Sequence, residues 1–179
     1  MSANLLYGLL AEFASPTELV EATRRAYADG YRKMDAYSPF PIEEAADALG
    51  FHKTGVPLVT LVGGLLGGAS GYLLQWWVNT IAYPLNIGGK PFHSWPSFIV
   101  ITFEMTILFA GLSAVIGMLA MNGLPMPYHP LFNVPRFAKA SRDGFFLCIE
   151  AADPRFDLDL TLAFLNSLKP QGPVLEVPD

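Results

Sequence analysis

Glu104 is the residue of this sequence whose type and position are most suggestive of chemistry. It is the only charged residue between Pro91 and Pro135, a stretch dominated by apolar side chains. A carboxyl group inside a bilayer is costly unless it is neutral or paired, so we expect it to face protein or water. Such a group could relay protons, pair with a charge on a neighbouring subunit, or bond in its protonated form to a helix backbone. Glu104 is expected to lie only about 10 Å deep, seven residues into the helix. This shallow position favours the structural role, in which the protonated carboxyl bonds to a helix backbone.

The other reactive side chains predict no catalytic or cofactor site. Cys148 is the only cysteine, so one chain cannot hold an iron–sulfur cluster, attach a c-type haem or form an internal disulfide. Its position in the middle of an expected strand indicates a buried thiol. His52, His93 and His129 are far apart and lie outside the apolar segments. We therefore expect this chain to bind no metal or cofactor and to catalyse nothing by itself.

Two apolar segments must position Glu104. No charged residue occurs from Thr54 to Gly89, and the chain as a whole is 52% hydrophobic and only 15% charged. The expected helices, Leu58–Ala82 and Ser97–Met121, each exceed the roughly 20 residues needed to cross a bilayer core. A helix of a soluble protein rarely stays apolar on every face over such a length. Residues 55–121 are therefore predicted to form a transmembrane hairpin.

Small residues recur at a spacing of four in both expected helices. They are Gly63, Gly64, Gly67, Gly68 and Gly71 in the first, and Ala110, Ser113, Ala114 and Gly117 in the second. In lipid, such residues allow two helix backbones to approach closely. The glycines cover more than one face of a helix, so two interpretations stay open: packing of the hairpin on itself, and contact with a helix of another chain.

Lysine and arginine residues predict the orientation. Five precede the hairpin, five follow it, and Lys90 alone lies in the connecting loop. Loops rich in these residues stay in the cytoplasm, so both termini are expected there, although Lys53 and Lys90, the nearest to the membrane, favour neither side. A net charge of -5 without a basic patch gives little support to nucleic-acid binding. An aromatic belt is expected at the outer boundary, formed by Trp76, Trp77, Tyr83 and Trp95.

The two flanks carry matching patterns of strand and helix. Residues 1–54 predict a strand over Leu5–Glu12, a helix from the Ser15 cap to Gly30, a weak strand over Tyr31–Tyr37 and a short helix over Ile42–Leu49. Residues 141–179 predict a strand over Gly144–Glu150, a helix over Leu158–Leu168 capped by Asp157, and a strand over Val174–Val177. This β-α-β, hairpin, β-α-β order predicts an α+β membrane protein in which the hairpin is inserted between the halves of a ferredoxin-like cytoplasmic domain.

A proline-rich segment, residues 122–140, follows the hairpin. Its prolines at 125, 127, 130 and 135 predict an extended arm, neither helix nor central strand. We expect Met126, Tyr128, Leu131 and Phe132 to place this arm along the membrane surface or along a partner.

A set of motifs spread over nearly the whole chain resembles one known family. In order, they are Ser38-Pro39-Phe40-Pro41-Ile42, Gly88-Gly89-Lys90-Pro91, Ser94-Trp95-Pro96, Phe103-Glu104, Leu124-Pro125, His129-Pro130-Leu131-Phe132 and Ser141-Arg142-Asp143-Gly144-Phe145-Phe146. Together they resemble ActD, the small two-helix subunit of bacterial alternative complex III. The combination is far more specific than any one motif.

The resemblance implies a place in a quinol-oxidising electron-transfer complex of the bacterial inner membrane. In that family the haems belong to cytochrome c subunits, the iron–sulfur clusters to a peripheral subunit, and the quinol site to polytopic membrane subunits. ActD is described without a cofactor, so the implied function is a non-catalytic accessory subunit that holds its partners together. A small proton or ion conductor built around Glu104 is the alternative. A membrane-tethered sensor is a third, although no polar cluster in the flanks supports it.

Overall fold

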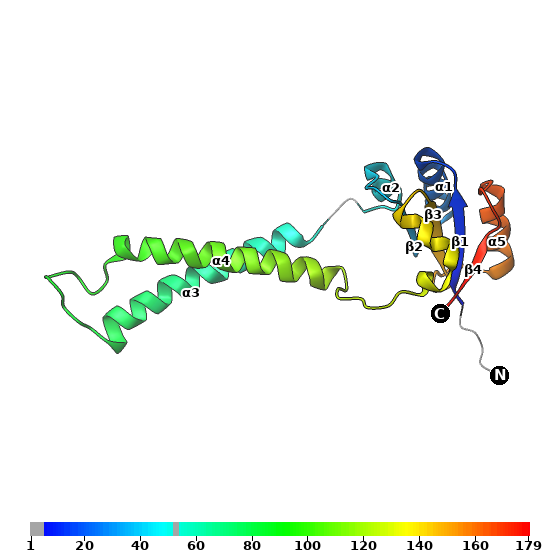
Figure 1. Cartoon of the computed structure of the whole chain (residues 1–179). Coiled ribbons are helices and arrows are strands. Elements are labelled where there is room, and N and C mark those ends of the chain that lie inside the picture. The colour runs from blue at the N-terminus through cyan, green and yellow to red at the C-terminus, as the bar shows by residue number, and fades with distance from the viewer. Residues whose placement is uncertain (1–5, 52–53) are drawn as a thin grey trace, which may run out of the picture. The chain divides into compact units, whose positions relative to one another are not determined.

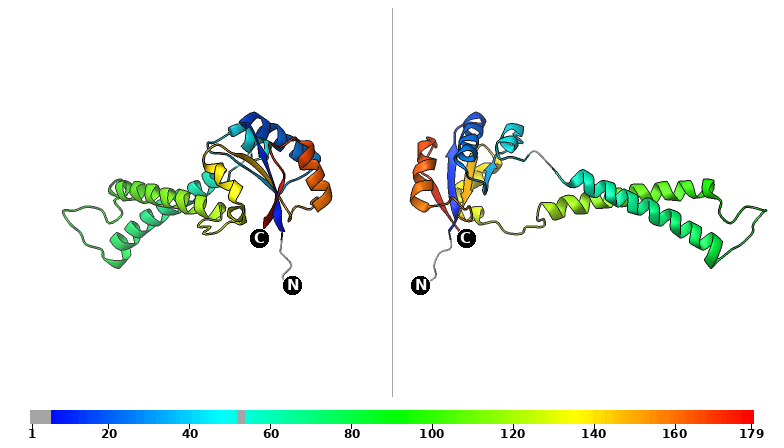
Figure 2. Two further views of the ribbon diagram at one scale, coloured as in Figure 1. Left: turned by 45° about the vertical axis from the view of Figure 1, so that its right-hand side comes forward. Right: turned by 180° about the vertical axis from the view of Figure 1, so that it is seen from behind.

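The computed structural model describes residues 6–51 and 54–179, which divide into two compact units (Figures 1 and 2). The sheet unit comprises residues 6–51 and 127–179, and the helical unit comprises residues 54–126. His52, Lys53 and Leu5, which entered the sequence-based expectations, lie outside the described residues.

The sheet unit is built on four antiparallel strands in the order β2-β3-β1-β4. The strands are β1 (Leu6–Phe13), β2 (Met34–Tyr37), β3 (Phe145–Glu150) and β4 (Leu175–Pro178). The central pair, β1 and β3, joins the two ends of the sequence, with Leu9 opposite Ile149 and Phe13 opposite Phe145. The strands expected from the sequence are therefore present, although β2 is shorter than the range that suggested it.

Three helices flank the sheet, and their ends follow local sequence signals. They are α1 (Pro16–Asp29), α2 (Glu43–Ala48) and α5 (Leu158–Ser167). The hydroxyl of Ser15 accepts a hydrogen bond from the backbone N–H of Glu18 at 3.3 Å, which caps α1. Gly30 ends the same helix at φ +106°, a conformation open to glycine. Asp157 caps α5 by accepting from the N–H of Leu160 at 3.0 Å.

The two faces of the sheet bury separate cores because alternate side chains point to opposite faces. Helices α1 and α5 cover the first face, where Leu9, Leu19, Leu147 and Leu165 are fully buried. Figure 2 shows these helices on one side of the strands. The second face carries Leu10, which packs with residues from the segment after the hairpin.

The proline-rich segment differs from the extended arm predicted for it. Two 3-10 helices, η2 (Pro130–Asn133) and η3 (Pro135–Ser141), cover the second face of the sheet. Leu131 is fully buried there, so its expected exposure to a membrane or partner is wrong. Proline fits the first turn of a helix, since its missing N–H would have no partner there, and each of these helices begins with one. Met126, Tyr128 and Phe132 remain exposed.

The helical unit is an antiparallel pair of long apolar helices. Helix α3 (Val56–Trp77) continues into one π-helical turn, η1 (Val78–Ala82), and α4 (Trp95–Met121) follows after a loop. Both are long and apolar enough to cross a membrane. The expected ranges were correct to within two residues at the start of each helix, and the predicted end at Ala82 includes the π-helical turn.

Candidate functional site

The contact between α3 and α4 is the most closely packed feature of the helical unit. Gly63, Gly67 and Gly71 lie on one column of α3, and all three are buried. A Cβ atom built on Gly67 would overlap the carbonyl oxygen of Met105 and lie 2.6 Å from the Cβ of Phe109. Carbon atoms prefer separations of about 3.5–4.0 Å. Gly67 therefore sets how closely the two backbones approach.

The neighbouring glycine column also faces α4. A Cβ on Gly64 would lie 3.4 Å from the Cβ of Ala110, and one on Gly68 would lie 2.7 Å from the hydroxyl of Thr106. The two columns, Gly63/Gly67/Gly71 and Gly64/Gly68, thus straddle a single helix. Contact with α4 crowds four of the five positions, whereas a Cβ on Gly64 would make ordinary van der Waals contacts.

Two of the small residues of α4, Ser113 and Gly117, contact α3. Ser113 lies directly opposite Gly63, and Gly117 approaches the side chain of Val59, whose Cγ1 would be 2.8 Å from a Cβ at that position. Ala114 is half-buried. These contacts pack the two helices of the hairpin closely against each other.

Gln75 makes a polar link across the hairpin that the sequence analysis missed. Its side-chain amide donates to the carbonyl oxygen of Phe98 on α4 and to that of Gly71 on its own helix, both at 3.1 Å. A hydrogen bond between helices is a favoured form of association in lipid. A lone glutamine in an otherwise apolar segment was the available signal.

Glu104 lies on the side of α4 away from α3. The α4 residues Met105, Phe109 and Ser113 face the glycines of α3, whereas Glu104 is exposed. Among residues 6–51 and 54–179 its carboxyl group forms no hydrogen bond or ion pair. Helix α4 begins at Trp95, so Glu104 lies about 14 Å from its start at 1.5 Å per residue. This is deeper than the sequence indicated.

The aromatic residues expected at the outer boundary gather at one end of the hairpin. Trp76 and Trp77 end α3, Trp95 begins α4, and all three are exposed. His93 lies at the same end, where its Nε2 is 2.7 Å from the hydroxyl of Tyr72. An exposed aromatic girdle of this kind suits the interface between lipid and water.

A charge cluster around one buried carboxylate ties η3 to the sheet. Glu12 on β1 is only 5% exposed, and its carboxylate pairs with the guanidinium of Arg136 and, at 3.2 Å, with the ammonium of Lys139. A buried carboxylate is tolerated when charge partners satisfy it, so this cluster fixes the segment that follows the hairpin.

A second group of titratable side chains surrounds His129 on the same face. The hydroxyl of Tyr7 is 3.3 Å from both the Nε2 of His129 and a carboxylate oxygen of Glu150. Burial, together with the charges of Glu150 and Asp35, raises the pKa of Tyr7 well above its usual value. Burial also raises the pKa of the Cys148 thiol, which is 1% exposed. The expectation of a buried thiol at Cys148 is thus confirmed, and the thiol is poorly suited to act as a nucleophile.

Asp153 organises the loops that meet just after the end of β3. Its carboxylate accepts backbone N–H bonds from Arg32 at 2.6 Å, Lys33 at 2.7 Å and Arg155 at 2.8 Å. Burial acts to raise the pKa of this carboxyl, but the three N–H groups outweigh burial and lower it. Asp153 therefore serves as a structural anchor in its charged form.

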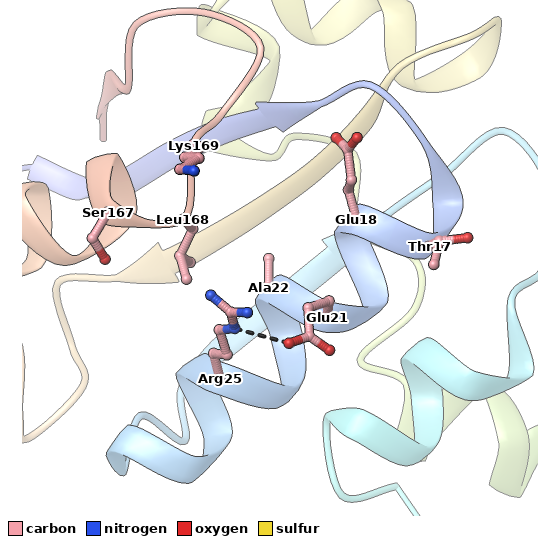
Figure 3. A pocket seen from close by; sticks show the side chains of 8 residues that line it. All are labelled: Thr17, Glu18, Glu21, Ala22, Arg25, Ser167, Leu168 and Lys169. Carbon is pink, nitrogen blue, oxygen red and sulfur yellow. Dashed lines mark hydrogen bonds and ion pairs between the residues drawn. The ribbon is translucent and has the colours of Figure 1, made fainter.

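One open pocket of about 440 Å³ lies between α1 and the end of α5 in the sheet unit (Figure 3). Its charged groups do not converge: Arg25 is held by Glu21 at 2.9 Å, while Glu18 lies apart from both. The lining residues are Thr17, Glu18, Glu21, Ala22, Arg25, Ser167, Leu168 and Lys169. The pocket is therefore a surface groove without a defined ligand chemistry. Within the described part of the chain, no three His, Cys, Asp or Glu residues are grouped to hold a metal ion.

These features define a class of protein: a mixed α/β sheet unit joined to a closely packed pair of apolar helices that suits a membrane. The family model described as "Alternative complex III, ActD subunit" matches residues 7–172, which include both units. The chain belongs to this family, and it is therefore a subunit of an oxidoreductase complex that carries out electron transport. Comparison with curated protein sequences finds no match.

Proposed function

We propose that this chain is a non-catalytic accessory subunit of alternative complex III that holds the cofactor-bearing subunits together. The match to the ActD family over residues 7–172 carries the proposal. The packing of the helical unit supports it, because Gly63, Gly67 and Gln75 hold α3 closely against α4. The partners would be the polytopic quinol-binding subunits, the cytochrome c subunits and the iron–sulfur subunit, which would carry the haems and clusters.

The proposal includes the domain organisation. A ferredoxin-like domain would be built on residues 1–54 and 141–179, with the hairpin at 55–121 inserted between these halves. Residues 122–140 would follow the hairpin, and their helices η2 and η3 pack on the second face of the sheet. The strand order β2-β3-β1-β4 supports this, as does the antiparallel pairing of β2 with β3. Neighbouring antiparallel strands are often joined by a tight turn, and here the helical unit lies between these two strands in the sequence.

The proposed topology has two membrane crossings in the bacterial inner membrane and both termini in the cytoplasm. The sheet combines strands from before and after the hairpin, so both flanks must lie on one side of the membrane. The loop carries a single Lys or Arg residue, Lys90, against five in each flank, and this difference favours the outer side for the loop.

Thiol labelling tests this topology. In a Cys148→Ala background, a new cysteine at Ile87, which is 74% exposed in the loop, is expected to react with a membrane-impermeant maleimide added outside. Labelling only after the inner membrane is opened would contradict the proposed orientation.

Co-purification tests the function itself. A tagged chain extracted from native membranes in mild detergent is expected to bring with it the other subunits of the complex, identified by mass spectrometry, and a c-type haem spectrum. A chain that purifies alone under conditions that keep the complex intact would contradict the proposal.

The rival function, a proton conductor built on Glu104, makes a different prediction. It requires proton flux in vesicles containing this chain alone, lost in Glu104→Gln. An accessory subunit is expected to show no flux in either form.

A further inference from the structure

The side of α4 that faces away from α3 combines an acidic residue with an open glycine. Successive residues of a helix are about 100° apart, so Glu104 and Gly111 lie within about 20° of each other around α4 and about 10 Å apart along it. Val100, Leu108 and Val115 share this side and are 63%, 52% and 54% exposed. We call these five residues the Glu104 face.

Glu104 has no side-chain partner among the residues that the structure describes. No described residue donates a hydrogen bond to its carboxyl or forms an ion pair with it. At about 14 Å from the start of a 27-residue helix, it lies within the part of α4 that the hydrocarbon core would cover. Long lysine and arginine side chains can extend to the interface from such a depth, but a glutamate side chain is too short.

Gly111 gives a second, independent indication of an occupant. A Cβ atom built on it would meet no atom within 4 Å, so no contact inside the chain requires glycine there. All five glycines of α3, in contrast, would bring a Cβ within 4 Å of α4. Glycine is a poor helix former, and in membrane helices it marks places where another backbone approaches closely.

We propose that the Glu104 face packs against a transmembrane helix of a different subunit of the complex. The partner backbone approaches closest at Gly111, and a hydroxyl, amide or basic side chain on the partner donates a hydrogen bond to the carboxyl of Glu104. This inference rests on the proposed function, and it adds the surface and the chemistry of the contact.

The chemistry of the face selects this occupant over two others. Lipid acyl chains offer no donor to the carboxyl. A second copy of this chain, related by a two-fold axis, would present the same face, on which Glu104 is accompanied only by Val, Leu and Gly side chains. It would thus bring two carboxyl groups together, and these can bond to each other only when at least one of them is protonated. A helix from a different chain can provide both the donor and a surface that fits Gly111.

Photo-crosslinking in native membranes tests the identity of the occupant. A benzophenone amino acid replaces Leu108, in the middle of the Glu104 face, in the full tagged chain. The expected product is a covalent adduct with a polytopic subunit of the complex, identified by mass spectrometry. Adducts with lipid alone, or with a second copy of this chain, would overturn the proposal.

Paired substitutions test the chemistry, with the yield of co-purified c-type haem per tagged chain as the measurement. Glu104→Leu is expected to lower this yield several-fold, whereas Glu104→Gln, which keeps hydrogen-bonding atoms, retains most of it. Gly111→Leu is expected to lower it similarly, and Gly111→Ala much less. Ala69→Leu places the same side chain on the exposed surface of α3 and is expected to leave the yield unchanged.

The outcomes separate this inference from the proposed function. If the unmodified chain brings no haem-containing subunits, the proposed function fails. If it brings them and the yields of Glu104→Leu and Gly111→Leu equal that of the unmodified chain, only the inference fails. Tryptophan fluorescence on each variant, unchanged from the unmodified chain, shows that its hairpin is folded.

Discussion

Replacing Gly67 by alanine is expected to destabilise the α3–α4 hairpin. The new Cβ would lie 2.6 Å from the Cβ of Phe109, about 1 Å closer than two carbon atoms prefer. It would also overlap the carbonyl oxygen of Met105, which belongs to the backbone and cannot rotate away. The helices must therefore separate by about 1 Å, and the contacts at the neighbouring Gly63 and Gly71 weaken with them.

The magnitude follows from comparison with Gly111→Ala. Both changes place alanine in the interior of a long helix, so both gain about 1 kcal/mol of helix propensity. Only Gly67→Ala also overpacks a filled contact, which typically costs about 1–3 kcal/mol. The difference between the two variants isolates that cost. It corresponds to roughly a five- to 150-fold change in the unfolding equilibrium constant.

The tryptophans of the chain make the assay specific for the hairpin. All three, Trp76, Trp77 and Trp95, lie in α3 or at the start of α4, so their fluorescence reports on the helical unit alone. The protein in mild detergent is titrated with a denaturing detergent, and the midpoints of the variants are compared. Equal midpoints for Gly67→Ala and Gly111→Ala would refute the packing described for Gly67.

Three further predictions concern the sheet unit. Because burial raises the pKa of the Cys148 thiol, iodoacetamide at pH 8 is expected to label the native chain at least tenfold more slowly than the denatured chain, and equal rates would contradict its burial. Asp153→Asn is expected to lose about 1–3 kcal/mol of stability. Since the pKa of Asp153 is lowered in the folded state, its contribution to the free energy of unfolding is present above the unfolded pKa of about 3.9 and is lost as the pH falls through the folded pKa. Thermal unfolding followed by circular dichroism should show that pH dependence in the unmodified chain and not in the variant. Arg136→Met is expected to cost about 1–3 kcal/mol because it removes one partner of the buried Glu12, whereas Arg25→Met, which breaks an exposed pair, should change stability by less than about 1 kcal/mol in the same assay.

The sequence predicted those parts of the fold that depend on neighbouring residues. Ser15 and Asp157 cap the starts of helices, and Gly30 caps the end of one, through bonds made within a few residues. The structure has all three residues in these roles. The two apolar helices were also evident, because length and the absence of charge are local properties. The existence of the four strands was evident in the same way, whereas their pairings join segments that are far apart in the sequence.

Features that depend on distant surfaces could not be predicted in the same way. The proline-rich segment was expected to be extended, since nothing local indicates that the second face of the sheet needs a cover for Leu10 and Cys148. The glycines of α3 left two interpretations open because they occupy two columns, and only the path of α4 shows that both columns contact this one helix, with Gly64 the least crowded. The link from Gln75 to Phe98 likewise depends on how the helices align.

The most direct measurement of the central claim is quinol oxidation by membranes from cells that lack this chain. The amount of assembled complex is expected to fall, while the turnover of the complex that remains assembled, normalised to c-type haem, is expected to stay unchanged. Full assembly with normal haem content but without quinol oxidation would show a catalytic role and contradict the account, as would full assembly with normal turnover.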